Sequence, residues 1–317
     1  MKNKGTKNIR YFAITKQAQD MQQTESTGTQ VVAVTGGKGQ LGQAIRKLSE
    51  KAPSYRFLFT DVESLDICSE EEVFRYVERN EVRTFINAAA YTAVDKAESE
   101  EDAALRINAG GVRNLGMAMK QCGGKVIHIS TDYVFDGLSC RPYVETDAVR
   151  PLSAYGRTKL AGEEALVEVG VPSAIVRTAW LYSENGNNFL RTILRLAQSR
   201  STLGIVSDQA GTPTFASDLA AVLLTMLKEP FVPGIFHFSN EGVCSWYDFA
   251  HKIVELAGLP CRIHPIETKD YPTAAARPAY SVLNKSKIKQ TYGIEGVHWE
   301  DRLREAMRCI NEQDCGL

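Results

Sequence analysis

The first 29 residues lack the periodic apolar positions that a folded core needs. They include the polar run QAQDMQQTESTGTQ and end at an apolar run, VVAVT, at residues 31–35. We therefore expect residues 1–29 to be a mobile extension, with folded structure beginning at residue 30.

From residue 30 onward, short apolar runs alternate with amphipathic segments of helical period. Strands are predicted at residues 31–35, 55–60, 84–90, 125–130 and 173–178. Helices are predicted at residues 43–50, 70–79, 99–121 and 153–169. This alternation predicts an α/β fold with a doubly wound parallel sheet of the Rossmann type.

Beyond Trp180 the alternation weakens, and Gly and Pro separate the remaining apolar segments. Helices are predicted there at residues 187–200, 216–228, 245–258 and 299–311. We expect a dinucleotide-binding domain over residues 30–178 and a smaller C-terminal lobe over residues 179–317 that mainly binds substrate. Some segments of that lobe, such as helix 216–228, are expected to pack back on the first domain.

Composition and charge narrow the classes of partner. The 37 Lys and Arg residues balance 38 Asp and Glu residues, so no global field attracts nucleic acid or an anionic membrane. The seven cysteines form no Cys-x-x-Cys pair, so neither a disulfide framework nor a zinc site is expected. No apolar run approaches the roughly 20 residues of a membrane span, and the start lacks the apolar core of a signal peptide. We expect a cytoplasmic protein with a small-molecule partner.

A glycine-rich loop, GGKGQLG at residues 36–42, follows the first strand directly. It satisfies G-x-G-x-x-G from Gly37 and a wider spacing from Gly36, and such glycines let backbone turn tightly beside a pyrophosphate. Asp61 closes the next strand, 19 residues beyond Gly42, where an acid receives ribose hydroxyls. The strand, loop, helix and acid together predict a dinucleotide site.

Two residues act in opposite directions on the choice of cofactor. Asp61 favours NAD, because its carboxylate bonds a free ribose hydroxyl and repels a 2′-phosphate. Lys38, inside the loop, carries an ammonium that attracts a 2′-phosphate. The expected cofactor is therefore NADPH or NADH.

A Tyr-x-x-x-Lys pair, Tyr155 and Lys159, lies near the start of the helix that follows the fourth strand, with both side chains on one face. A neighbouring ammonium lowers the pKa of a phenol from about 10 and makes it a better proton donor near neutral pH. The fourth strand ends in Ser130-Thr131-Asp132, and the carboxyl ends of parallel strands face the ligand crevice. These residues predict carbonyl reduction, with Thr131 or Ser130 bonding the carbonyl oxygen.

The glycine loop, the stretch at residues 87–90, the Thr-Tyr-Lys set and the length together resemble the extended short-chain dehydrogenase/reductase superfamily. More specific strings resemble one family within it, the dTDP-4-dehydrorhamnose reductases. They are NAAAYTAVDKAE at 87–98, STDYVFDG at 130–137, YGRTKLAGE at 155–163, RTAWLY at 177–182, GNNF at 186–189, DQAGTPT at 208–214 and ARPAYSVL at 276–283. The likeness extends from residue 30 to about residue 311.

This resemblance implies reduction of the 4-keto group of dTDP-4-dehydro-L-rhamnose by NAD(P)H, for the synthesis of surface polysaccharide. The implied catalytic residues are Tyr155, Lys159, Thr131 and Asp132. The cofactor-binding candidates are Gly36, Gly37, Lys38, Gly39, Gln40, Leu41, Gly42, Asp61, Asp66, Ile67, Ala89, Ala90 and Tyr91, with Tyr155 and Lys159. The substrate-binding candidates are Val94, Thr131, Asp132, Trp180, Asn188 and Arg277.

Two of these side chains have simple alternative roles. A Trp just beyond a strand end can stack on a sugar or base, and it can equally pack between lobes, so both roles stay open for Trp180. The guanidinium of Arg277 can grip a diphosphate bidentately or form an ordinary surface ion pair.

One feature departs from the resemblance. Some members of the family dimerise through a metal held by glutamates, one of them two residues after the last loop glycine. Here Ala44 occupies that place, and the helix end at residues 197–200 also lacks an acid. The five histidines form no metal-ligand spacing, and His128, inside a strand, is expected in the core. We therefore expect no metal site and a monomer or weak homodimer.

Two other functions remain as alternatives. One is a nucleotide-sugar epimerase or dehydratase of the same superfamily, in which the cofactor is recycled. The other is a non-catalytic regulatory subunit resembling the β subunit of methionine adenosyltransferase. The strings RTAW and GNNF argue against the first, and the intact set of Tyr155, Lys159 and Thr131 argues against the second.

Overall fold

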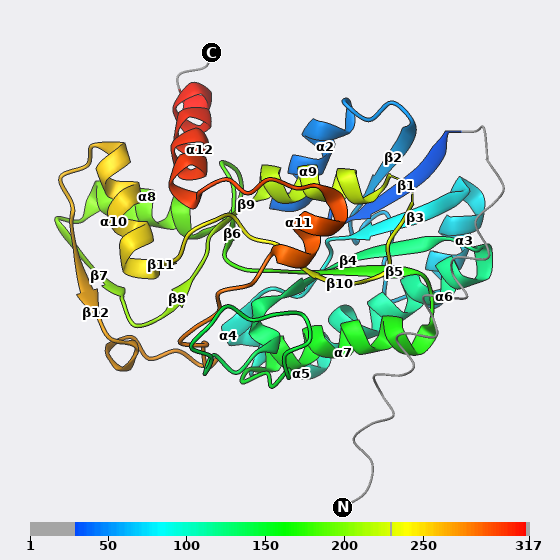
Figure 1. The fold of residues 1–317 in the computed structure, drawn as a ribbon, viewed down its shortest axis with the longest axis horizontal. Coiled ribbons are helices and arrows are strands. Elements are labelled where there is room, and N and C mark those ends of the chain that lie inside the picture. The colour runs from blue at the N-terminus through cyan, green and yellow to red at the C-terminus, as the bar shows by residue number, and fades with distance from the viewer. Residues whose placement is uncertain (1–28, 229, 315–317) are drawn as a thin grey trace, which may run out of the picture.

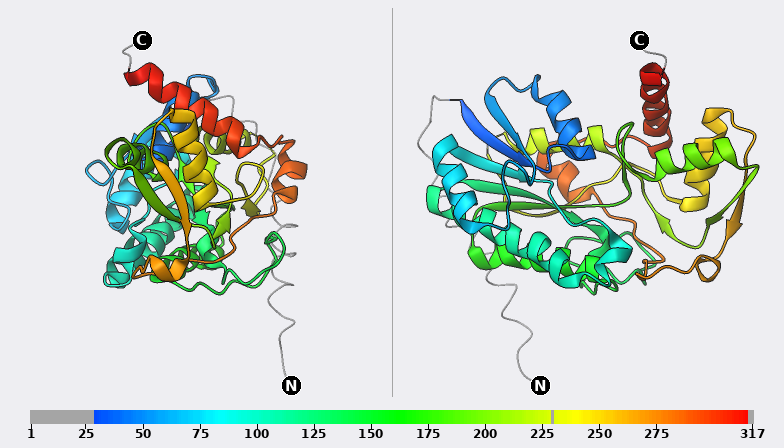
Figure 2. Two further views of the ribbon diagram at one scale, coloured as in Figure 1. Left: turned by 90° about the vertical axis from the view of Figure 1, so that its left-hand side faces the viewer. Right: turned by 180° about the vertical axis from the view of Figure 1, so that it is seen from behind.

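The computed structural model describes residues 29–228 and 230–314. A sheet covered by helices forms the larger lobe, and a smaller lobe lies at its side (Figures 1 and 2). The extension predicted for residues 1–29 falls almost entirely outside the described residues.

The main sheet has six parallel strands in the order β10-β5-β4-β3-β1-β2. These strands are β1 (Gln30–Thr35), β2 (Tyr55–Thr60), β3 (Val82–Asn87), β4 (Lys125–Thr131), β5 (Ser173–Thr178) and β10 (Gly234–His237). The prediction of a doubly wound parallel sheet is confirmed. Strand order reverses between β1 and β3, and in such sheets the ligand crevice lies outside the carboxyl ends at that point.

Helices cover both faces of this sheet (Figure 1). One face carries α2 (Gln40–Ser49) and α9 (Ala216–Met226), and the other carries α3 (Glu70–Asn80), α6 (Val112–Cys122) and α7 (Ala154–Val169). Within β1, Val32 and Val34 face the first layer, whereas Val31 and Ala33 face the second. Because both faces are buried, the strands read as continuous apolar runs.

The helix predicted at residues 99–121 is interrupted. It consists of α5 (Glu101–Leu105), a π-helical segment η1 (Arg106–Gly111) and α6, and a short α4 (Val94–Ala97) precedes it. Helix α7 comes so close to η1 that a Cβ at Gly162 would lie 2.1 Å from the carbonyl oxygen of Asn108. Such π segments are rare and often occur at functional sites.

The main sheet differs from the prediction at two strands. The strand predicted at residues 84–90 ends at Asn87, and the following three alanines leave the sheet. Strand β10 was not predicted, because its four residues follow no long apolar run; it joins the sheet through parallel pairing with β5.

The smaller lobe has its own core, in which Phe249, Ile253 and Leu303 are fully buried. Its helices are α8 (Phe189–Ser199), α10 (Trp246–Ala257) and α12 (Trp299–Asp314). Short strands pair in and around it: β6 (Leu181–Tyr182), β7 (Thr202–Val206), β8 (Ala210–Gly211), β9 (Thr214–Phe215), β11 (Cys244–Ser245) and β12 (Arg262–Ile266). The remaining elements are η2 (Asp132–Val134), η3 (Thr268–Asp270) and α11 (Ser286–Tyr292).

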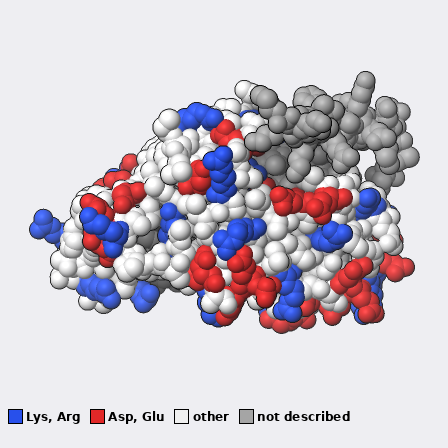
Figure 3. All heavy atoms as spheres, turned by 90° about the horizontal axis from the view of Figure 1, so that it is seen from below, with Lys and Arg blue, Asp and Glu red and all other residues white. Residues whose placement is uncertain are grey.

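The surface reflects the balanced composition. On the face shown in Figure 3, acidic and basic side chains are interspersed. Within residues 29–228 and 230–314, no helix is both long enough and apolar enough to span a bilayer.

Candidate active site

A cleft of about 1020 Å³ opens at the carboxyl ends of the central strands and continues along the smaller lobe. Most of the residues predicted from sequence line it together: Gly36, Lys38, Gly39, Gln40, Leu41, Gly42, Asp61, Asp66, Ile67, Ala89, Ala90, Val94, Thr131, Asp132, Tyr155, Lys159, Trp180 and Asn188. Three others, Gly37, Tyr91 and Arg277, do not line it. The cleft is large for one drug-sized ligand and suits two ligands side by side.

The glycine loop forms a cradle at one end of the cleft. Gly36 has φ of +67°, and its carbonyl oxygen accepts a hydrogen bond from the Gly39 amide at 3.0 Å. A Cβ at Gly42 would lie 2.3 Å from that same oxygen, so a side chain there would force the loop open. Helix α2 begins directly after Gly39, and its first free N–H groups suit an anion such as a pyrophosphate.

Charged residues at the next strand end hold this loop. The amide of Lys38 donates to Asp61 Oδ2 at 2.9 Å, and the amide of Gly37 donates to the carbonyl oxygen of Thr60 at 2.9 Å. Gly37 therefore packs the loop on β2 instead of lining the cleft. The Lys38 ammonium lies 2.9 Å from Glu63 Oε2 in an exposed ion pair, and Glu63 raises its pKa. A 2′-phosphate would have to compete with Glu63 for this ammonium.

The phenol of Tyr155 faces the end of β4. Burial raises the pKa of Tyr155 to about 12, against a hydrogen bond with Thr131 that lowers it. The Thr131 hydroxyl also donates to Asp132 Oδ1 at 3.0 Å. Burial raises the pKa of Asp132 to about 6, and the hydroxyls of Ser281 and Thr131 partly offset this. The phenol is therefore protonated at neutral pH.

Lys159 lies one helical turn after Tyr155 and is almost completely buried. Its ammonium donates to the carbonyl oxygen of Ile129 at 2.7 Å. Burial lowers its pKa to about 8, and the charge of Glu163 opposes this. We expected Lys159 to lower the pKa of the phenol, but the effects acting on Tyr155 are burial, Thr131 and the charge of Asp132.

The structure distinguishes the two hydroxyls at the end of β4. Ser130 also lines the cleft, but its Oγ donates to Glu163 Oε1 at 2.5 Å and so joins the buried ion pair of Glu163 and Arg177. Thr131 is left as the hydroxyl that meets Tyr155.

An aromatic wall closes the cleft on the side of the smaller lobe. Trp180 has φ of +48°, which is unusual for a bulky residue and marks a position held by its surroundings. Its ring stacks on Trp246 with 3.5 Å between centroids and 10° between planes, and Phe189 lies 4.6 Å from Trp246. A Cβ at Gly211 would lie 2.6 Å from the Trp180 ring. Phe189 follows the predicted Asn188 directly in the sequence, whereas Trp246 lies on a distant segment and was not indicated by any motif.

Asn188 connects the smaller lobe to the glycine loop. Its Oδ1 accepts from the Arg191 amide at 3.0 Å and caps α8, while its Nδ2 donates to Gln40 Oε1 at 2.9 Å. Both ends of this amide are therefore engaged within the protein, although the residue lines the cleft.

Arg277 and Tyr91 lie outside the cleft lining. Arg277 makes a bidentate pair with Asp95, at 3.1 and 2.8 Å, so the surface ion pair is the role that the structure shows for it. The Tyr91 hydroxyl donates to Glu100 at 2.5 Å, and its amide donates to Asn108 Oδ1 at 2.8 Å. The Ala-Ala-Tyr segment thus reaches the cleft through its alanines alone.

Several lining residues were missed by the sequence analysis: Thr35, Thr60, Val62, Leu65, Cys68, Ala88, Thr92, Arg106, Ile107, Ile129, Tyr133, Thr178, Ala179, Leu181, Gly186, Asn187, Phe189 and Trp246. Some of these residues are direct neighbours of predicted residues in the sequence, and this proximity could have identified them. Arg106 and Ile107 line the cleft from η1. The amphipathic pattern predicted an ordinary helix there and did not indicate that these two residues reach the cleft.

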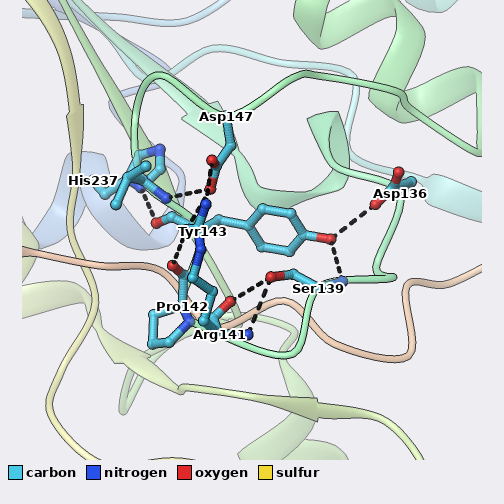
Figure 4. Close-up of polar contacts among 8 residues, drawn as sticks. Asp136, Ser139, Arg141, Pro142, Tyr143, Asp147 and His237 are labelled. Atoms are coloured by element: carbon cyan, nitrogen blue, oxygen red, sulfur yellow. Dashed lines mark hydrogen bonds and ion pairs between the residues drawn. The ribbon is translucent and has the colours of Figure 1, made fainter.

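The segment between η2 and α7 is fixed by its own polar contacts (Figure 4). Tyr143 donates its hydroxyl to Asp136 Oδ1 at 2.9 Å, and Arg141 makes a bidentate pair with Asp147 at 3.0 and 2.8 Å. His237 Nδ1 lies 3.1 Å from the Tyr143 carbonyl oxygen, which ties the segment to β10. These contacts stabilise the chain that directly follows Thr131 and Asp132.

Among the described residues, no group of three or more His, Cys, Asp or Glu side chains is placed to hold a metal ion. His128 is fully buried in β4, 3.0 Å from the side-chain amide of Asn87, and burial lowers its pKa well below the usual value.

Comparison with known proteins identifies the family. The sequence pattern of the RmlD substrate binding domain matches residues 30–312. A dTDP-4-dehydrorhamnose reductase from Aggregatibacter actinomycetemcomitans is 41% identical over 283 residues, covering 86% of this chain and 96% of that protein.

Solved structures agree. A dTDP-4-dehydrorhamnose reductase from Clostridium acetobutylicum has a TM-score of 0.86 at 41% identity, covering 89% of this chain and 99% of that one. The Bacillus anthracis dTDP-4-dehydrorhamnose reductase, solved with NADP, has a TM-score of 0.84 at 37% identity, covering 88% and 99%. The resemblance drawn from sequence is confirmed, and this chain belongs to the RmlD substrate binding domain family, which it shares with dTDP-4-dehydrorhamnose reductases.

Proposed function

We propose that the protein reduces the 4-keto group of dTDP-4-dehydro-L-rhamnose to give dTDP-L-rhamnose, using NADPH or NADH. The observation that carries this proposal is the shared cleft, which joins a glycine cradle to the set of Thr131, Tyr155 and Lys159. The relatives named above act on this substrate according to their names, and their similarity covers nearly the whole described chain.

The cleft residues fit a dinucleotide. Gly39 lines the cleft, where a Cβ would meet only the Gly36 carbonyl oxygen at 3.2 Å, so backbone can approach a pyrophosphate. Asp61 and Asp66 line the same cleft and would lie at the adenosine ribose, and Tyr155 and Lys159 would lie at the nicotinamide. When bound, the cofactor supplies the hydride that reaches the carbonyl carbon.

The side chains supply the proton and orient the carbonyl. Tyr155 keeps its proton at neutral pH, because burial raises its pKa to about 12. As negative charge develops on the carbonyl oxygen, that oxygen becomes more basic than a phenolate, so proton transfer from Tyr155 is favourable. Thr131 lies next to the phenol, lowers its pKa against the effect of burial, and lines the same cleft, where its hydroxyl could bond the carbonyl oxygen. Lys159, one helical turn after Tyr155, adds a buried cation at this part of the cleft, where it could hold the nicotinamide ribose.

Substrate would lie between these groups and the aromatic wall. Trp180 presents a ring held by Trp246, which suits stacking on the sugar or base, and Val94 lines the same cleft.

The test is an NAD(P)H oxidation assay against a panel of 4-keto dTDP-, GDP- and UDP-sugars. The proposal expects stoichiometric loss of NAD(P)H with dTDP-4-dehydro-L-rhamnose and slower loss with the others. An epimerase or dehydratase would convert substrate with no net loss of cofactor. A regulatory subunit would turn over none of them and would copurify with a synthetase.

We also propose that the protein is a cytoplasmic monomer or weak homodimer that needs no metal. Ala44 supports the absence of a metal-bridged dimer. It is buried against the core at the position where some family members carry a metal-holding glutamate. Sedimentation with magnesium and with EDTA should give the same mass. A dimer that dissociates in EDTA would contradict the proposal.

A further inference from the structure

We propose that Glu163 is a positioning residue for the reductase reaction, one that keeps Lys159 charged and holds together the strand ends carrying the reacting groups. The inference rests on the proposed function, in which Lys159 acts as a cation beside Tyr155. It concerns a residue to which the sequence analysis assigned no role.

Glu163 connects three elements of the larger lobe in a buried site. Its carboxylate accepts from Arg177 Nε at 2.9 Å and Nη2 at 2.6 Å, and from Ser130 Oγ at 2.5 Å. All three residues are at most 3% exposed. Because Glu163 lies on α7, Ser130 on β4 and Arg177 on β5, the carboxylate joins the helix to both strands.

These contacts lie next to the reacting groups in the chain. Ser130 directly precedes Thr131, which lies next to the Tyr155 phenol and lowers its pKa. Arg177 directly precedes Thr178, which lines the cleft two residues before Trp180. Movement of Glu163 would therefore disturb both sides of the substrate position.

Lys159 lies one helical turn before Glu163 on the same face of α7. It is 2% exposed, and the hydrogen bond from its ammonium goes to an uncharged partner, the carbonyl oxygen of Ile129. A buried cation with such a partner is costly unless an anion is near. The carboxylate of Glu163 pairs directly with Arg177, and its charge also acts on Lys159.

Other charged groups around α7 do not replace this carboxylate. On β4, His128 is uncharged, because burial and the charge of Lys159 lower its pKa. Asp132, in η2, acts on Tyr133 and Tyr155 at the cleft. On the solvent side, Arg157 pairs with Glu101 and Arg113 with Glu168.

The charged and titratable groups near Arg177 and near the C-terminal end of α7 do not replace Glu163 either. On β10, His237 is uncharged, with its pKa lowered to about 3 by burial and by Arg177. Glu145 and Lys287 interact electrostatically with each other and with Arg177. On α6, Lys120 donates to the Val169 carbonyl oxygen at 2.7 Å. Glu163 is the carboxylate that opposes the effect of burial on Lys159.

The test compares Glu163→Gln, which removes the charge, with Glu163→Asp, which keeps it. The first readout is the titration of the Lys159 side chain in ligand-free protein, from ¹³C-labelled lysine, with Lys159→Met assigning the resonance. The second is the alkaline limb of the pH profile of kcat/KM. In Glu163→Gln both should move to lower pH by on the order of one unit. In Glu163→Asp both should stay near the wild-type values.

Two further variants separate charge from structure. Ser130→Ala removes a hydrogen bond to Glu163 without changing its charge, so both titrations should stay unchanged. If Glu163→Gln does not fold, because Arg177 is left unpaired, Glu163→Gln combined with Arg177→Met replaces the buried pair with neutral groups, a change that proteins often tolerate. Loss of the Arg177 cation alone would raise the pKa of Lys159, so a fall in the double variant can come only from Glu163.

A Lys159 titration that is the same in wild type and in the charge-removing variants would overturn the proposal. This readout needs no substrate. If wild-type protein reduced no sugar nucleotide, the proposed function would fail, and the link between Glu163 and Lys159 would still be decided.

Discussion

At the scale of single residues, burial decides which groups of the site carry protons. Tyr155, with a pKa of about 12, holds its proton firmly at neutral pH, and Lys159, with a pKa of about 8, is charged in most molecules. Asp132, with a pKa raised to about 6, is largely ionised at pH 7 and becomes protonated in mild acid. An acid and a cation are therefore both available at neutral pH.

The phenol proton is tested by Tyr155→Phe, which keeps the ring and removes only the hydroxyl. We expect kcat to fall by roughly 10² to 10⁴, the range for a lost general acid, while NADPH still binds. Stopped-flow turnover and fluorescence titration measure the two quantities. Near wild-type turnover would remove Tyr155 from the mechanism.

The charge of Asp61 should set part of the cofactor preference. Its carboxylate also accepts a hydrogen bond from the Lys38 amide, so Asp61→Ala should weaken both cofactors and NADH the more. Asp61→Asn is the matched variant, because it keeps an acceptor for the loop amide and removes the charge that repels a 2′-phosphate. We expect the ratio of Kd for NADH to Kd for NADPH to rise in both variants. An unchanged ratio would show that Asp61 holds the loop and does not distinguish a free 2′-hydroxyl from a 2′-phosphate.

Glu63 should weaken the binding of NADPH, because it pairs with the Lys38 ammonium that a 2′-phosphate would meet. Glu63→Gln releases the Lys38 ammonium from its exposed ion pair, so we expect the Kd of NADPH to fall a few-fold at low salt. The effect should shrink at high salt, because exposed charge interactions are weak and screened. NADH, which lacks the 2′-phosphate, is the control, and an equal gain for NADH would contradict this reading of Lys38.

At the scale of elements, the contact between η1 and α7 shapes the cleft wall. Asn108 of η1 is fully buried, donates to Thr158 Oγ1 at 3.0 Å and holds Tyr91 through its amide. Because Arg106 and Ile107 line the cleft from this same segment, its position matters for ligands as well as for folding.

Gly162 makes this close packing possible. In Gly162→Ala the new Cβ would lie 2.1 Å from the Asn108 carbonyl oxygen, so the two segments must separate. We expect the free energy of unfolding to fall by about 1–3 kcal/mol, more than the gain of up to about 1 kcal/mol from helix propensity. Urea unfolding measures this. Gly110→Ala is the matched control, because a Cβ at Gly110 meets nothing within 4 Å, and equal losses for both variants would refute the steric cause.

At the scale of the whole molecule, buried uncharged histidines link stability to pH. Burial lowers the pKa of His237 to about 3 and that of His128 well below its usual value of about 6.5. In mild acid the unfolded chain therefore binds protons that the native protein does not, so stability falls as pH falls. Asp132 acts in the opposite sense between about pH 4 and 6, because its raised pKa makes the native state bind the extra proton.

His237→Gln tests this linkage. In the window from pH 6 to pH 4, we expect the variant to lose less stability than wild type, by about 1.4 kcal/mol for each pH unit. Urea unfolding at several pH values gives the two slopes. Parallel slopes would mean that His237 is protonated in the native protein or that its protonation does not affect folding.

The sequence by itself determined the features that depend on neighbours in the chain. The first strand, glycine loop and helix α2 follow one another without interruption, and the spacing of Tyr155 and Lys159 on α7 is a property of one helical turn. The apolar runs predicted five of the six strands of the main sheet, because strands buried on both faces must be apolar throughout. About half of the residues that line the cleft were therefore predicted from these motifs and from the family resemblance that they carry.

Only the tertiary structure decided how distant side chains pair. Arg277 meets Asp95 across 182 positions and so stays outside the cleft, whereas Asn188 reaches Gln40 across 148 positions. Trp246 supports Trp180, and Glu163 lies with Arg177 and Ser130, although no local period connects these residues. The physical reason is that burial and charge pairing depend on which segments come together in space. The protonation of Tyr155, Lys159 and Asp132 follows from that packing and cannot be read from residue type or spacing.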